Sequence, residues 1–167
     1  LFRAGHGSLL EHPRHGTHGI CVLARQNLEA HAALVPNPAA KRCAIMLATV
    51  RIRHKAGWLS ILGVHAPPPI RACGSENAET LAEVARWIEA GRLTRGIGTA
   101  LSGDPVVVAG DLNAHPLSAS LANLRDRGLV EACAATHWRP ILTWAPRRWF
   151  PYAAKLDYVL VGRHLRP

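Results

Sequence analysis

The sequence lacks any apolar run of the roughly 18 residues that a membrane span needs, and its first residues show no basic segment followed by an apolar one. A membrane protein or an intact secretory precursor is therefore not expected. Cysteine is scarce, with four residues and no CxxC spacing, which argues against a zinc site or a disulfide framework. Lysine is scarce too, at three of 20 basic residues. These absences leave a folded globular domain as the expected class.

What the chain has is a large apolar fraction and a strongly positive charge. With 167 residues, 49% of them hydrophobic, it is long and apolar enough for one domain with its own core. The formal net charge is +9, and 17 of the basic residues are arginine. Because these residues are scattered along the chain, two interpretations stay open: a solvated basic surface, and a surface that binds a polyanion such as nucleic acid.

The spacing of apolar residues predicts strands that alternate with two helices. Strands are expected at 19–24, 43–53, 58–65, 106–109 and 156–161, the last two buried on both faces. Helical spacing predicts a helix over 77–90 and a second helix that Pro116 opens and Gly128 closes, with Leu117 on its apolar face. The first eighteen residues, rich in Gly, His and Pro, are expected to form a loop. This order favours a layered α/β domain with helices packed on sheet faces.

Polar residues that end or interrupt the buried strands are the candidate functional residues, since an unpaired buried charge is costly. His65 ends one strand, Asp111 ends the next, and Asp157 lies within the last. Asn113 should project with Asp111, because residues two apart in an extended segment share a face. Ordinary structural roles are the alternative: turn residues for Asp111 and Asn113, and a structural histidine for His65. Asp157 could pair with Lys155.

Four segments, in this order along the chain, resemble those of the endonuclease/exonuclease/phosphatase superfamily. Residues 106–116 (VVVAGDLNAHP) contain its GDxN signature, and residues 61–69 (ILGVHAPPP) are similar to its strand that ends in histidine before a proline-bearing loop. Residues 142–146 (LTWAP), followed by KLDYVLV, resemble its threonine–tryptophan segment and its penultimate, aspartate-bearing strand. Residues 19–25 (GICVLAR) are similar to an early G-x-x-x-L-S-R strand, with Ala24 in place of the usual serine. The layout is closest to bacterial members.

The resemblance implies a layered α/β sandwich in which helices flank packed, mostly antiparallel β-sheets. It also implies metal-assisted cleavage of a phosphate ester, with Mg²⁺ or Mn²⁺ as the cofactor. Asp111 and Asn113 would hold the metal or the attacking water. His65 would steady the phosphate or protonate the leaving group, and Asp157 would support a catalytic histidine.

The resemblance also bears on the partners. Trp144 and Arg147 lie in the segment that leads to Asp157, and they are candidates for substrate contact; packing of Trp144 over the sheet edge is the alternative. The expected partner is a phosphate-ester substrate, with nucleic acid as one candidate, and the chain is expected to be a monomer.

The chain departs from the family pattern at both ends. The family's strand with the principal metal-binding Glu should precede the matched segments, and its Ser-Asp-His segment should follow them. Glu11, in a loop-like context, and His164, close behind Asp157, do not fill these roles. Residues 1–167 are therefore expected to form one incomplete domain with little hydrolytic activity of its own.

Two further hypotheses remain. One is a catalytically dead remnant of the fold that binds phosphates or nucleic acid. The other is a metal-binding loop, since imidazole is a common metal ligand. The histidines of this loop are His6, His12, His15 and His18.

Overall fold

The computed structural model of the chain describes residues 6–13, 19–25, 30–35, 47–54, 57–70, 74–89, 105–136, 141–145, 153–162 and 165. Side chains are described for residue 53 and, within these ranges, for most residues from 58 onward.

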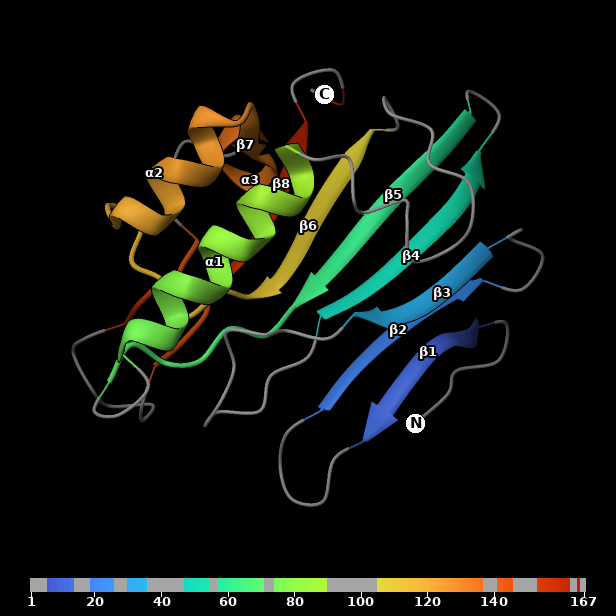
Figure 1. Cartoon of the computed structure of the whole chain (residues 1–167), viewed down its shortest axis with the longest axis horizontal. Helices are drawn as coiled ribbons and strands as arrows, with labels where there is room; N and C mark the ends of the chain where they lie inside the picture. Colours follow the sequence, from blue (N-terminus) through green and yellow to red (C-terminus); the bar gives the residue numbers. More distant parts are fainter. Residues whose placement is uncertain are drawn as a thin grey trace.

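Eight strands in the described part of the chain form two sheets (Figure 1). The smaller sheet is an antiparallel hairpin of β1 (His6–Pro13) and β2 (Gly19–Arg25). The larger has the order β3-β4-β5-β6-β8-β7, and its strands span Ala30–Val35 (β3), Leu47–His54 (β4), Gly57–Val64 (β5), Val106–Asp111 (β6), Leu129–Glu131 (β7) and Asp157–Gly162 (β8). All neighbours in it are antiparallel except β5 and β6, which are parallel. The β1–β2 hairpin approaches β3, β4 and β5.

Helices cover one face of the larger sheet. The chain crosses from β5 to β6 through α1 (Gly74–Glu89), while α2 (Ala119–Asp126) and the short α3 (Ala132–Thr136) lie between β6 and β8 in sequence. Figure 1 shows α1 and α2 side by side, and buried residues of both helices pack in one core with residues of β5, β6 and β8. A parallel pair needs such a crossover, which explains why the longest helix falls between β5 and β6. The predicted sandwich of helices and mostly antiparallel sheets is confirmed.

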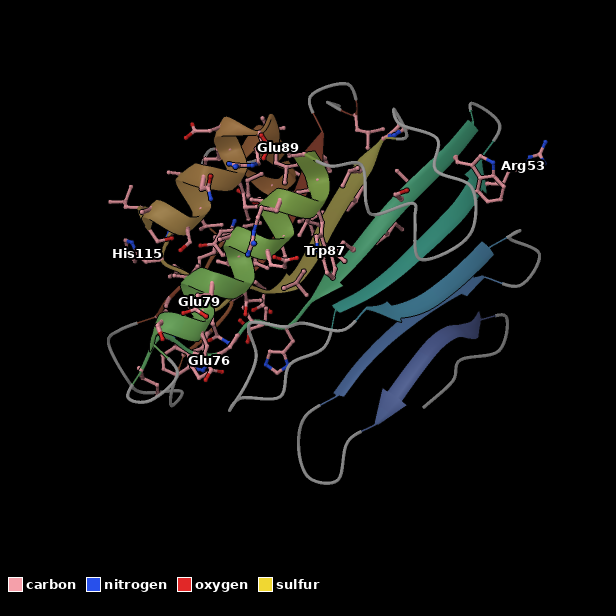
Figure 2. All side chains as sticks on the ribbon, in the orientation of Figure 1. Arg53, Glu76, Glu79, Trp87, Glu89 and His115 are labelled. Carbon is pink, nitrogen blue, oxygen red and sulfur yellow. The ribbon has the colours of Figure 1, made fainter. Side chains whose placement is uncertain are left out.

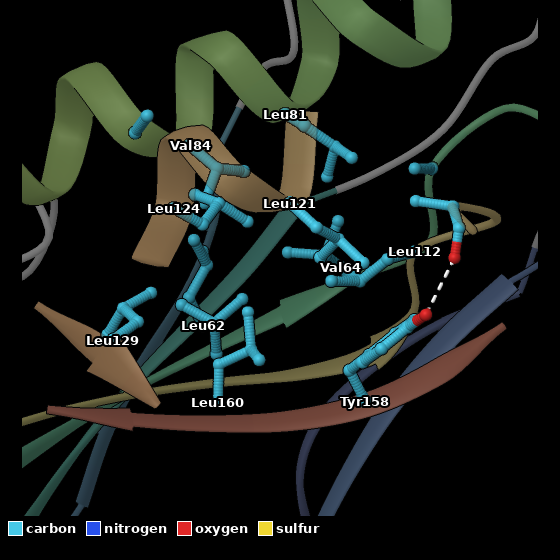
Figure 3. Packing of buried hydrophobic residues seen from close by; sticks show 14 of the residues in the cluster. Leu62, Val64, Leu81, Val84, Leu112, Leu121, Leu124, Leu129, Tyr158 and Leu160 are labelled. Carbon is cyan, nitrogen blue, oxygen red and sulfur yellow. Dashed lines mark hydrogen bonds between the residues drawn. The ribbon is translucent and has the colours of Figure 1, made fainter. Parts of the chain in front are cut away.

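The core lies between these helices and the sheet (Figure 3). Alternate residues of β5 and β8 point into it, such as Leu62 and Val64 on β5 and Leu160 on β8. From the helix side, Leu81 and Leu124 meet them. Figure 2 shows Trp87 between α1 and the sheet, where its indole N–H donates to Glu83.

The alternation of side chains along a strand also distinguishes the two faces of the larger sheet. On β8, Tyr158 and Leu160 are buried under the helices, while Asp157 and Val159 are exposed on the opposite face. The prediction that β6 and β8 are buried on both faces is therefore wrong: Val108 is the fully buried residue of β6. The face of the sheet turned away from α1 and α2 remains open at Val159.

Several predicted boundaries also need correction. The first eighteen residues contain a strand, β1, because its backbone pairs with β2 regardless of its polar composition. The second helix begins at Ala119, where the hydroxyl of Ser118 accepts from the Leu121 N–H at 3.3 Å, and not at Pro116. Leu117 lies before the helix and is 86% exposed. The first helix starts at Gly74, three residues earlier than predicted.

Candidate active site

Two carboxylates face each other at the end of β6 and the start of β8. Asp111 and Asp157 are cross-strand partners in the antiparallel ladder, and residues directly opposite each other share a face. The Leu112 N–H donates to Leu156 O at 2.9 Å and continues the pairing past the strand end. By the alternation along β6 and β8, both carboxylates lie on the face turned away from the helices.

The pKa of Asp111 is raised above its ordinary value. Burial is the largest cause, and the negative charge of Asp157 adds to it. The hydrogen bond from the Asn113 backbone and the charge of His65 act in the opposite direction. The negative charge of Asp157 thus opposes the ionisation of Asp111, and a cation between the two carboxylates would relieve that repulsion.

His65 lies beside Asp111 because β5 and β6 are parallel and end at the same edge of the sheet. The strand β5 ends at Val64, so His65 is the first residue of the loop that follows. Its Nε2 is 4.0 Å from Asp111 Oδ2. The Ala66 N–H donates to Asp111 O at 2.8 Å, which ties the backbones of the two strand ends together.

Asn113 reaches the same edge in a turn. Its φ is +47°, and its backbone N–H donates to Asp111 Oδ1 at 2.9 Å. The prediction of an extended segment from which both side chains project is wrong, because this hydrogen bond curls the backbone back toward Asp111. The side-chain Nδ2 of Asn113 donates to Ala66 O at 2.9 Å, so the amide also binds the loop after His65.

The segment that leads to Asp157 is held by Thr143. Its Oγ1 accepts from the backbone N–H groups of Leu156 and Asp157, each at 3.0 Å. Trp144 forms an isolated β-bridge with Ala154, and 49% of its surface is exposed. The structure thus brings the threonine–tryptophan segment to the strand that carries Asp157.

The alternative role for Asp157, an ion pair with Lys155, is wrong. Lys155 Nζ lies 2.7 Å from Glu131 Oε1, and both side chains are 9% exposed. Its ammonium group also lies 5.2 Å from the centre of the Tyr158 ring, on the helix side of the sheet.

Other predicted residues cannot be compared with the structure. Arg147 and His164 lie outside the described residues, as do His15, His18 and the side chains of the other two histidines of the proposed metal-binding loop.

Asn77 on α1 is a residue at this site that the sequence reasoning missed. It is buried, and its side-chain amide donates to backbone carbonyls of the loops after β5 and β6. One signal was present: Asn77 lies one helical turn before Leu81, on the apolar stripe of α1, where a polar side chain needs a partner.

The donors at this edge fit a hydrated divalent cation. Asp111 and Asp157 offer carboxylate oxygens and Asn113 an amide oxygen, and oxygen ligands are those that Mg²⁺ and Mn²⁺ prefer. Among the described residues, no group of three His, Cys, Asp or Glu side chains could hold a metal. Mg²⁺ commonly uses one or two carboxylates and fills its remaining positions with water and substrate phosphate, so the oxygens of Asp111 and Asp157 are compatible with such a site.

The chain is thus a layered α/β protein with polar residues gathered at one edge of its larger sheet, where open α/β sheets commonly bind ligands. The model of the endonuclease/exonuclease/phosphatase family matches residues 2–167, and the chain belongs to this family. Its members are phosphoester hydrolases and generally use divalent metals. No curated protein matches the chain at a significant level.

Solved structures of the family share the fold at low sequence identity. The human nocturnin catalytic domain with bound sulfate superposes with a TM-score of 0.71 at 17% identity, covering 96% of this chain and 61% of that one. A humanized D. rerio TDP2 superposes with a TM-score of 0.70 at 16% identity, covering 95% of this chain and 62% of that one. A Bacteroides thetaiotaomicron mannosyl-6-phosphatase superposes with a TM-score of 0.66 at 13% identity, covering 95% of this chain and 63% of that one. The chain therefore spans about three fifths of the length of these relatives.

Of the helices in the described part of the chain, none combines the length and apolar character that a membrane-spanning helix requires.

Proposed function

We propose that the chain carries the site of a divalent-metal-dependent phosphoesterase, with Mg²⁺ or Mn²⁺ as the cofactor. One observation supports this most: Asp111 and Asp157 are paired across β6 and β8, with His65 and Asn113 at the same edge. In a member of this family, that arrangement offers oxygen ligands for a cation and a titratable donor beside them.

Each residue would have a separate role. A bound divalent cation supplies polarisation of the phosphoryl oxygens and offsets developing negative charge. Asp111 orients or deprotonates the attacking water. Asn113 holds water or phosphate beside it, and His65 steadies the phosphate or protonates the leaving group. The family resemblance gives Asp157 the role of supporting an acid–base histidine, and no histidine of residues 1–167 is assigned to that role.

The substrate is a phosphodiester or a phosphomonoester. Trp144, exposed beside the strand of Asp157, and Arg147 are the proposed substrate contacts. A structure of D. rerio TDP2 holds a single-stranded DNA product, and another relative is a mannosyl-6-phosphatase. The net charge of +9 makes nucleic acid one candidate substrate here.

We further propose that residues 1–167 alone hydrolyse these esters poorly. The described residues supply two facing carboxylates and no third acidic, histidine or cysteine ligand. The same observation favours a second candidate function, a catalytically dead remnant that binds phosphates or nucleic acid through its basic surface.

Metal binding separates the two functions. The free Mn²⁺ signal in electron paramagnetic resonance, followed as protein is added, measures affinity without any substrate. We expect the wild-type chain to bind Mn²⁺ and Asp111→Asn to bind it about tenfold or more weakly, about 1.4 kcal/mol. Asp126→Asn, the same substitution at an exposed position of α2, is the matched control and should bind like the wild type. A wild-type chain that does not bind Mn²⁺ overturns the phosphoesterase proposal.

Hydrolysis provides the second test. Bis(p-nitrophenyl) phosphate, p-nitrophenyl phosphate and single-stranded DNA are incubated with Mg²⁺ or with a chelator. We expect little or no metal-dependent cleavage. Robust cleavage that Asp111→Ala abolishes would show that two carboxylates suffice. DNA binding that collapses steeply with salt, without Mn²⁺ binding, would support the remnant instead.

A further inference from the structure

One buried amide on α1 contacts both loops of the candidate site. Asn77 is only 4% exposed. Its Nδ2 donates to Pro67 O at 2.7 Å and to Leu112 O at 3.0 Å, with Asn113 O at 3.3 Å. The two protons of one NH₂ group thus serve carbonyls from two separate loops.

These carbonyls belong to the residues that place the functional side chains. Pro67 lies two residues after His65, and Leu112 and Asn113 directly follow Asp111. The two loops also contact each other, through Ala66 N–H to Asp111 O and Asn113 Nδ2 to Ala66 O. Asn77 adds a third connection, and it comes from a different element of the fold.

Asn77 contacts the two loops of the site from the other face of the sheet. It projects from α1, on the helix side of the sheet, while the carboxylates of Asp111 and Asp157 lie on the opposite face. No substrate on that face could touch Asn77. The hydrogen bonds that its Nδ2 donates go to backbone carbonyls, and each buried carbonyl that loses its donor becomes an unsatisfied polar group.

We propose that Asn77 is a positioning residue that fixes the His65 loop against the Asp111–Asn113 loop, and thereby sets the arrangement of the site residues. A test of this role by Mn²⁺ affinity rests on the proposed function, whereas a test by backbone hydrogen exchange does not. The simpler possibility is that Asn77 only attaches α1 to the sheet, in which case its loss would weaken the whole domain evenly.

Hydrogen exchange distinguishes a local from a global role. Asn77→Leu keeps a similar size and removes both donors, and Asn77→Asp removes them in an isosteric side chain. We expect the backbone N–H groups of Ala66 and Asn113 to exchange about tenfold faster in these variants, while Ser60 N–H, bound to Pro105 O in the β5–β6 region, keeps its rate relative to the rest of the core.

Val84→Ala is the matched control, since Val84 is fully buried on the same helix and does not belong to either loop. It should speed exchange throughout the core without favouring Ala66 and Asn113. Equal acceleration at all sites in Asn77→Leu, or no change at Ala66 and Asn113, overturns the proposal. If neither Asn77 variant folds, the proposal is tested on the wild-type protein. The side-chain amide protons of Asn77 should exchange about a hundredfold more slowly than those of a free amide, and unprotected protons overturn the proposal.

The Mn²⁺ affinity of the same variants forms the second arm. We expect Asn77→Leu to bind Mn²⁺ about tenfold more weakly and Val84→Ala to bind it like the wild type while both are folded. If the wild type does not bind Mn²⁺, the proposed function fails, but the exchange pattern still tests Asn77. If the wild type binds Mn²⁺ and Asn77→Leu binds it equally well with unchanged exchange, only the role of Asn77 is refuted.

Discussion

Gly110, in the GDxN segment, is a position where a single added methyl should damage the site. Its φ is +136°, a conformation that side chains rarely adopt, and a Cβ built there would lie 2.1 Å from Val64 O. Because that atom belongs to the backbone of β5, no side-chain rotation relieves the overlap. The backbone strain alone is about 1–3 kcal/mol. Together with the displacement of β6 from β5, we expect Gly110→Ala to destabilise the domain by about 4 kcal/mol.

Urea unfolding followed by circular dichroism measures this effect as a lower midpoint at similar slope. In a chain of this size, about 4 kcal/mol corresponds to a melting temperature about 10 °C lower. Ala109→Gly, at the preceding residue of β6, is the control and should cost only about 1 kcal/mol, the entropy of an added glycine. A Gly110→Ala variant that unfolds at the wild-type midpoint would refute the close approach of β6 to β5.

Two further predictions concern the helix side of β8. Lys155→Met removes the counter-ion of Glu131 in a site where both side chains are 9% exposed, while the N–H groups of Cys133 and Ala134 still donate to the Glu131 carboxylate. Urea unfolding should show a loss of about 3 kcal/mol in the free energy of unfolding, and Lys155→Met/Glu131→Gln should recover most of it; an unchanged midpoint in the single variant contradicts this. Burial raises the pKa of Tyr158 from 10.0 to about 12. Because this phenol ionises at lower pH in the unfolded chain than in the folded one, the stability that it contributes should be lost as pH rises from about 10 through 12. Ultraviolet titration should show a phenol that ionises near pH 12 and is absent in Tyr158→Phe; a phenolate formed by Tyr158 near pH 10 would disprove the burial argument.

The strands that carry the site could be predicted from local sequence. The apolar residues of β5, β6 and β8 make each strand recognisable, and polar residues stand where the apolar runs end. His65 and Asp111 were therefore found as strand-end residues, and the parallel pairing of β5 and β6 then brings them within 4.0 Å. The stripe of α1 at Leu81 was equally visible, because a long amphipathic helix carries its own signal.

What the sequence did not reveal depends on partners distant in the chain. The strand β1 has the composition of a loop and is extended because β2 pairs with it. A local pattern shows that Asn77 is a polar residue on an apolar stripe, but it does not show that the accepting carbonyls lie ten to 36 residues away. The local sequence likewise does not distinguish Gly110 from an ordinary turn glycine, because its constraint comes from Val64 O on another strand.

The two oxygens of Asp111 are engaged differently, and this decides how substitutions there can be interpreted. Oδ1 accepts the Asn113 N–H and stabilises a turn with φ of +47°, while Oδ2 faces His65. Asp111→Ala removes both, so the turn loosens at the same time as the charge disappears, and a loss of metal binding would have two causes. Asp111→Asn keeps one oxygen that can accept from Asn113 and replaces the charged oxygen that faces His65 with an amide NH₂ group. A loss of Mn²⁺ affinity in Asp111→Asn with unchanged exchange of the Asn113 N–H would therefore assign the effect to the carboxylate itself, separately from the shape of the loop that Asn77 supports.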